Sequence, residues 1–105
     1  MSDFTQGPFS VAETRHKYDI VIRGPKNEPI ALVLIAGIAK KEGAANARLI
    51  AAAPDLLEAL QWYEAKAVQM GRAAIHQDSK LMLELMKEIA VEYGAQARAA
   101  IARAT

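Results

Sequence analysis

Residues 46–60 read NARLIAAAPDLLEAL, and this stretch decides the fold because it joins two helices at Pro54. Residues 42–53 and the residues after Pro54 both carry Ala, Leu and Ile at helical spacing. Proline is tolerated in the first turn of a new helix, whereas it would kink a continuous one. Asp55 and Glu58 fall in that first turn, where carboxylates favour the exposed backbone amides. The stretch therefore predicts a short helix over 42–53 and a second helix that begins at Pro54.

The C-terminal half is predicted to form a helical hairpin. Apolar residues recur at three- and four-residue steps along 54–76, at Leu56, Leu60, Tyr63, Ala67, Met70 and Ala74, and again along 79–104, at Met82, Met86, Ile89, Tyr93, Ala97 and Ile101. The polar residues 76–79 separate the two stripes, and Asp78 or Ser79 is a suitable N-cap for the last helix. At about 1.5 Å per residue each helix is roughly 35 to 40 Å long, so the two match as an antiparallel pair.

The N-terminal third has the pattern of a small sheet. Residues 18–23 alternate in the two-residue period of a strand, with Tyr18, Ile20 and Ile22 on one face. Residues 24–27, Gly-Pro-Lys-Asn, predict a turn with Asn27 at a left-handed position. Residues 30–35 are apolar on both faces, so this second strand is expected to lie between neighbours, and residues 9–11 are expected to form a third strand at the edge.

Together these elements predict one α+β domain over residues 1–105. A small antiparallel β-meander occupies 5–39, and the helical region 42–105 contains a short helix followed by a long antiparallel α-helical hairpin. A length of 105 residues fits one domain with a thin core.

Composition excludes several classes of function. The net charge is +1 and no half is strongly basic, since residues 1–43 carry six Lys or Arg against five Asp or Glu and residues 44–105 carry seven of each. Binding to bulk nucleic acid is therefore disfavoured, because it needs a basic stripe. The absence of cysteine rules out disulfides and fits a reducing cytoplasm. The longest apolar run, residues 30–39, is too short to span a bilayer. We expect a cytoplasmic protein with no membrane partner.

The stretch 46–60 resembles a block found in small accessory proteins of bacteriophages and prophages, including the early-region accessory proteins of lambda-like phages. Residues 5–11 resemble the Thr-Pro-Gly-Pro-Trp-like start of these proteins, with Gln6 and Phe9 as departures, and residues 22–33 resemble their hairpin, with Asn27 in place of a turn glycine. Residues 97–105 are similar to their last helix, whereas about 63–95 look specific to this chain. The resemblance implies a phage gene and carries over no catalytic or binding residue.

A hairpin of this length is expected to project beyond a three-stranded sheet that is only about 17 to 20 Å along a strand. Part of its apolar surface would then lack a cover within the monomer. Residues 95–104 are rich in alanine, whose small side chain lets another helix approach the last helix closely. These features predict homo-oligomerisation through the helices. The alternative is that alanine reflects helix propensity on a solvated surface.

No residue pattern indicates an enzyme, a cofactor or a metal site. His16 and His76 lack the spacing of metal ligands, the three serines lack a glycine elbow, and the six glycines form no phosphate-binding loop. We expect no catalytic residue.

Six residues are candidates for ligand binding. Arg72 and His76 lie one helical turn apart near the predicted tip of the hairpin and Lys80 follows the turn, so the three could bind a phosphate or form an ordinary solvated loop. Trp62 either offers a ring to a base or a partner, or packs inside the protein. Arg98 and Arg103 lie in a stretch without acidic residues, where they either bind an anion between subunits or complement the helix dipole.

Three functions are consistent with this pattern. The first is a non-enzymatic phage accessory protein for counter-defence or host takeover, which binds a bacterial immune protein or sequesters a small nucleotide signal between helices. The second is a structural or regulatory helper of the phage, such as a scaffold or a modulator of a phage complex. The third is nucleic-acid binding through Lys40, Lys41 and Arg48, which the near-neutral charge disfavours.

Overall fold

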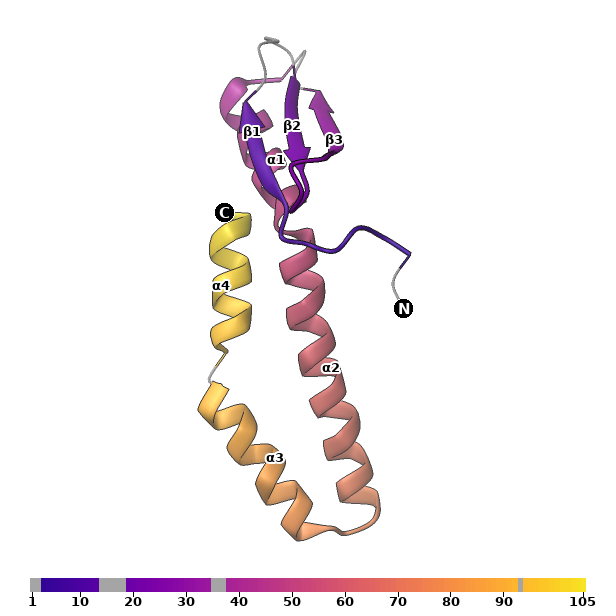
Figure 1. Ribbon diagram of the computed structural model, residues 1–105. Coiled ribbons are helices and arrows are strands. Elements are labelled where there is room, and N and C mark those ends of the chain that lie inside the picture. Colours follow the sequence, from indigo (N-terminus) through magenta and orange to yellow (C-terminus); the bar gives the residue numbers. More distant parts are fainter. Residues whose placement is uncertain (1–2, 14–18, 35–37, 93) are drawn as a thin grey trace.

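The computed structural model describes residues 3–13, 19–34, 38–92 and 94–105. A three-stranded antiparallel sheet precedes four helices, so the predicted α+β architecture is confirmed (Figure 1). The elements in chain order are β1 (Ser10–Glu13), β2 (Asp19–Arg23), β3 (Pro29–Leu34), α1 (Lys40–Ala51), α2 (Ala53–Ile75), α3 (Ser79–Glu92) and α4 (Ala95–Ala104).

The sheet has the strand order β1-β2-β3, in which both pairs are antiparallel. The turn between β2 and β3 forms as predicted, because the backbone N–H of Gly24 donates to the Glu28 carbonyl at 2.8 Å and Asn27 has a φ of 62°. The predicted strand residues Tyr18 and Ile35 lie outside the described residues, and so does His16.

The expectation that the second predicted strand lies between neighbours was wrong. This strand is β3, and within the described sheet it pairs only with β2, so it forms an edge. Its residues alternate: Val33 packs toward α1, whereas Leu32 and Leu34 point to the opposite face and are 62% and 72% exposed. Apolar residues on both faces therefore indicate an uncovered sheet face here, and not a central strand.

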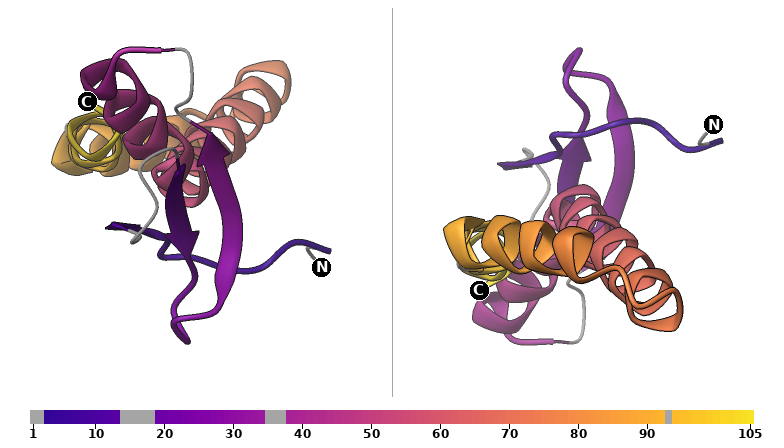
Figure 2. Two further views of the ribbon diagram at one scale, coloured as in Figure 1. Left: turned by 90° about the horizontal axis from the view of Figure 1, so that it is seen from above. Right: turned by 90° about the horizontal axis from the view of Figure 1, so that it is seen from below.

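Helix α1 covers one face of the sheet. Ile22 and Val33 of the strands pack on Ala47 and Ala51 of α1, and Phe9, Ile20 and Ile30 surround this cluster. Ala47 and Ala51 are one helical turn apart, and their small side chains let the helix approach the strands closely. The helices are gathered on one side of the sheet in both views along the long axis (Figure 2).

The junction between α1 and α2 forms as residues 46–60 predict. Helix α1 ends at Ala51, and Pro54 lies in the first turn of α2. The N-terminal segment packs against this junction, because a Cβ atom at Gly7 would come within 2.7 Å of the Pro54 Cβ. Glycine at position 7 therefore permits a close approach of backbone to proline ring.

The helical hairpin extends well beyond the sheet (Figure 1). The molecule measures 59 × 27 × 20 Å and has a Cα radius of gyration of 18.4 Å, whereas a compact chain of this length has about 13 Å. The tip turns where Gln77 adopts a φ of 53°. Asp78 caps α3 as predicted, since its Oδ1 accepts the backbone N–H of Leu81 at 3.0 Å.

The prediction of one continuous last helix over 79–104 was wrong. Helix α3 ends at Glu92 and α4 begins at Ala95, so the returning arm of the hairpin is bent. Gly94 has a φ of 72°, a left-handed conformation that a continuous helix cannot contain. Tyr93, which was assigned to the apolar stripe, lies outside the described residues.

Small side chains fill the inside of the hairpin. Ala59, Ala73 and Ala100 are buried there together with Leu85. Leu60, Met86 and Ile101 were assigned to the inner stripes, yet all three are more than half exposed. The inward face is therefore rotated relative to the predicted stripes, which leaves large apolar side chains in solvent.

Candidate binding site at the tip of the helical hairpin

The six residues predicted to bind a ligand do not form one site. Arg72, His76 and Lys80 are near the tip, where α2 ends and α3 begins, and Trp62 is about halfway along the arm. Arg98 and Arg103 belong to α4, which lies beside the first half of α2.

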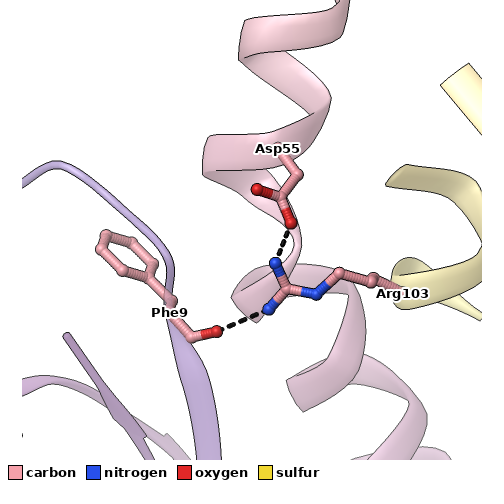
Figure 3. A network of polar contacts seen from close by, with 3 residues as sticks. All are labelled: Phe9, Asp55 and Arg103. Carbon is pink, nitrogen blue, oxygen red and sulfur yellow. Dashed lines mark hydrogen bonds and ion pairs between the residues drawn. The ribbon is translucent and has the colours of Figure 1, made fainter. Parts of the chain in front are cut away.

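Arg103 joins three parts of the chain. Its Nη1 forms an ion pair with the Asp55 carboxylate at the start of α2, and its Nη2 donates to the backbone carbonyl of Phe9 at 2.7 Å (Figure 3). The guanidinium therefore holds the end of α4 against both the helix junction and the segment that leads into β1. Arg103 therefore has a structural role, and its role in binding an anion between subunits stays a prediction.

Arg98 lies beside a second contact that holds the bend. The Tyr63 hydroxyl on α2 donates to the Glu92 carboxylate, which also accepts the backbone N–H groups of Gly94 at 2.9 Å and Gln96 at 2.6 Å. The Tyr63 hydrogen bond, followed by the two backbone amides, lowers the pKa of Glu92, and the charge of Arg98 lowers it further. Glu92 thus caps the start of α4 and ties it to α2.

Trp62 packs within the hairpin and does not present a bare ring. Its ring meets Tyr63 edge-on at a centroid distance of 4.9 Å, and the Lys66 ammonium lies 5.4 Å from the ring centroid. Lys66 also forms an ion pair with Glu88 of α3. Both aromatic residues are half-buried, and the role of Trp62 as a platform for a base or a partner stays a prediction.

Arg72, His76 and Lys80 are all exposed. Arg72 lies in the last turn of α2, where the helix dipole favours a cation, and His76 is the C-cap of this helix. Their role as phosphate ligands stays a prediction.

A groove at the tip was not predicted from the sequence. It has a volume of about 400 Å³ and is lined by Ala73, Ala74, Gln77, Asp78, Ser79, Met82, Leu83 and Met86. We call this set the tip groove. The predicted ligand residues Arg72, His76 and Lys80 are not among its lining residues. The sequence signal that marks it is the close spacing of Met82, Leu83 and Met86 directly after the polar turn.

The residues of the tip groove are suited to bind an apolar side chain of a partner. Leu83 and Met86 are more than half exposed along α3, although both are large and apolar. Polar groups of Gln77, Asp78 and Ser79 border the groove at the turn. Methionine is unbranched and polarisable, so it adapts to differently shaped partners.

The described residues contain no cluster of three or more His, Cys, Asp or Glu side chains that could hold a metal ion. Within the same part of the chain, no helix has both the length and the apolar character needed to cross a membrane.

The chain belongs to the family described as Salmonella phage P22 protein Y8K6, which it matches over residues 1–105. No curated protein and no solved structure matches it. The phage origin that residues 46–60 predict is confirmed by this family, whereas the specific link to the early-region block stays a prediction.

Proposed function

We propose that this phage protein is a non-enzymatic accessory protein that binds a bacterial protein in the cytoplasm of the infected cell, in counter-defence or host takeover. The tip groove is the contact surface in this proposal. The single observation that supports it most is an apolar groove at the far end of an arm that extends beyond the rest of the molecule.

The composition of the tip groove favours a protein over a nucleotide. Protein interfaces combine an apolar centre with a polar rim, and the groove has Met82, Leu83 and Met86 beside the polar turn. A nucleotide is usually held by a stacking aromatic ring and by cations. The residues that line the groove include neither, and Asp78 adds a carboxylate that repels phosphate.

The position of the groove suits contact with a large partner. The tip is remote from the sheet and α1, so a bulky protein can reach it without meeting the N-terminal part of the chain (Figure 1). Interface energy is concentrated in a few central residues. Leu83 and Met86 are the candidates here because both combine size with exposure.

A photo-crosslinking amino acid at position 83 tests the proposal during infection. We expect it to capture a bacterial protein that also binds the purified chain directly, and Leu83→Glu is expected to weaken that binding at least tenfold. Lys87→Glu is the matched control, since Lys87 is an exposed α3 residue outside the tip groove. Binding that survives Leu83→Glu would overturn the proposal.

Two further outcomes separate the alternatives. Capture of a phage protein in place of a bacterial one would support a structural or regulatory helper. A thermal shift with a nucleotide, lost in the Arg72→Ala, His76→Ala double variant, would support sequestration of a nucleotide signal at the predicted cations.

A further inference from the structure

Helix α2 carries a second apolar surface, on the side that faces away from α3 and α4. Successive helical residues are about 100° apart, so one side of α2 presents Leu57, Leu60, Glu64, Val68, Gly71, Arg72 and Ile75, which we call the outer stripe. The buried residues Ala59 and Ala73 lie on the opposite side. Leu60 is 67% exposed and Ile75 is 79% exposed. A Cβ atom at Gly71 would have nothing within 4 Å.

The molecule exposes more surface than its mass requires. Its accessible surface is 7819 Å² at 11.4 kDa, whereas a compact monomer of that mass exposes about 5,800 Å². The excess of about 2,000 Å² per chain is more than twice the roughly 800 Å² that each partner buries in a standard interface. The surface available is therefore large enough for a complete dimer interface.

One side of α4, the alanine-rich helix predicted to associate with other copies, packs within the monomer. Ala100 of α4 is buried, and α4 packs against both α1 and α2. The outer stripe, in contrast, runs along α2 as a long apolar surface, with Val68 at its centre.

We propose that the outer stripe binds the same stripe of a second copy, with the two α2 helices antiparallel around a two-fold axis at Val68. The charges on the stripe select this orientation. Glu64 precedes Val68 by four residues and Arg72 follows it by four, so in the antiparallel pair each Glu64 is level with Arg72 of the second copy. A parallel pair in register would place Glu64 against Glu64 and Arg72 against Arg72, which is unfavourable.

The same axis places large residues level with large ones and small residues level with small ones. Ile75 of one copy comes level with Gln61 of the other, next to Leu57 and Leu60, and Gly71 comes level with Ala65. A glycine and an alanine at facing positions let the two helices approach closely. The interface is separate from the tip groove, so it does not depend on the proposed function.

Single cysteines report the orientation directly, because the natural chain contains none. In the antiparallel dimer Val68→Cys lies on the two-fold axis and is expected to form a disulfide-linked dimer in most of the protein under mild oxidation. Leu57→Cys lies far from its copy and is expected to stay unlinked. Efficient linking of Leu57→Cys would indicate a parallel pair and would overturn the proposal.

Sedimentation velocity of the full chain reports the interface itself. We expect a dimer at 50 µM, and Val68→Glu is expected to raise the dissociation constant at least a hundredfold. Val91→Glu is the matched control, since Val91 is 87% exposed on α3 and outside the stripe; it is expected to leave the dimer intact. Equal behaviour of the two variants, or a wild-type monomer at this concentration, would overturn the proposal.

Charge reversal tests the specific pairing. Glu64→Arg and Arg72→Glu are each expected to weaken the dimer about tenfold, and the double variant is expected to recover most of the loss. Failure of the double variant to recover, while circular dichroism shows it folded, would contradict the pairing of Glu64 with Arg72.

Discussion

Glu92 accepts three hydrogen bonds at the bend of the hairpin. Its carboxylate accepts hydrogen bonds from Tyr63, 29 residues earlier in the chain, and from the backbone of Gly94 and Gln96. The hydrogen bond to Glu92 raises the pKa of Tyr63, and the same bond lowers the pKa of Glu92. Both shifts favour the state in which the phenol is neutral and the carboxylate is charged.

These shifts predict how stability depends on pH. Because the folded pKa of Glu92 lies below 4.5, its contribution is fully present above that pH and is lost as the pH falls through the folded value. The raised pKa of Tyr63 means that its contribution is present below pH 10.0 and is lost above it. In urea titrations, the difference in unfolding free energy between wild type and Glu92→Gln is expected to shrink between pH 6 and pH 3. A constant difference over that range would contradict this role.

The contacts of Arg103 could not be predicted from the sequence. The sequence shows its charge and its position near the helix end, but its partners Asp55 and Phe9 lie 48 and 94 residues away. Only the packing of α4 beside α2 brings them together. Of the six predicted binding residues, Trp62 and Arg103 contact other residues of the monomer, and Arg98 lies near Glu92.

Among the elements, those with local signals were predictable. Pro54 marked the start of α2, Asn27 marked the turn of the β2–β3 hairpin, and Asp78 marked the start of α3. The edge position of β3 was not predictable from its apolar residues, because an uncovered face and a central strand give the same pattern. The break at Gly94 was missed because an isolated glycine within an apolar repeat is also tolerated in a helix.

Substitution of alanine for each of two glycines in the helical hairpin is expected to have opposite effects on stability. Gly94→Ala is expected to destabilise the protein by about 1 kcal/mol, because alanine disfavours a left-handed backbone, and the new Cβ would come within 3.1 Å of the Arg98 guanidinium. Gly71→Ala is expected to stabilise it by about 0.5–1 kcal/mol, since the site is helical and open. Chemical denaturation in a Val68→Glu background checks both without a contribution from dimer formation. Stabilisation by Gly94→Ala would show that the bend is not required.

At the scale of the whole molecule, the sequence predicted an arm longer than the sheet but not which side of the arm is covered. Alanine gives a weak signal of burial, so Ala59 and Ala73 were passed over in favour of Leu60 as the inward residues. The rotation of α2 moves large apolar residues to the outside. This rotation accounts for the exposure of Leu60 and the other large residues of the outer stripe.

Small-angle X-ray scattering of the Val68→Glu variant tests the projecting arm most directly, after light scattering has shown a mass of 11.4 kDa. Both proposed surfaces depend on an arm that stands clear of the sheet and α1. The account predicts a radius of gyration at or slightly above 18.4 Å. A value near 13 Å, as expected for a compact chain of this length, would show that the arm is folded back and would contradict the account.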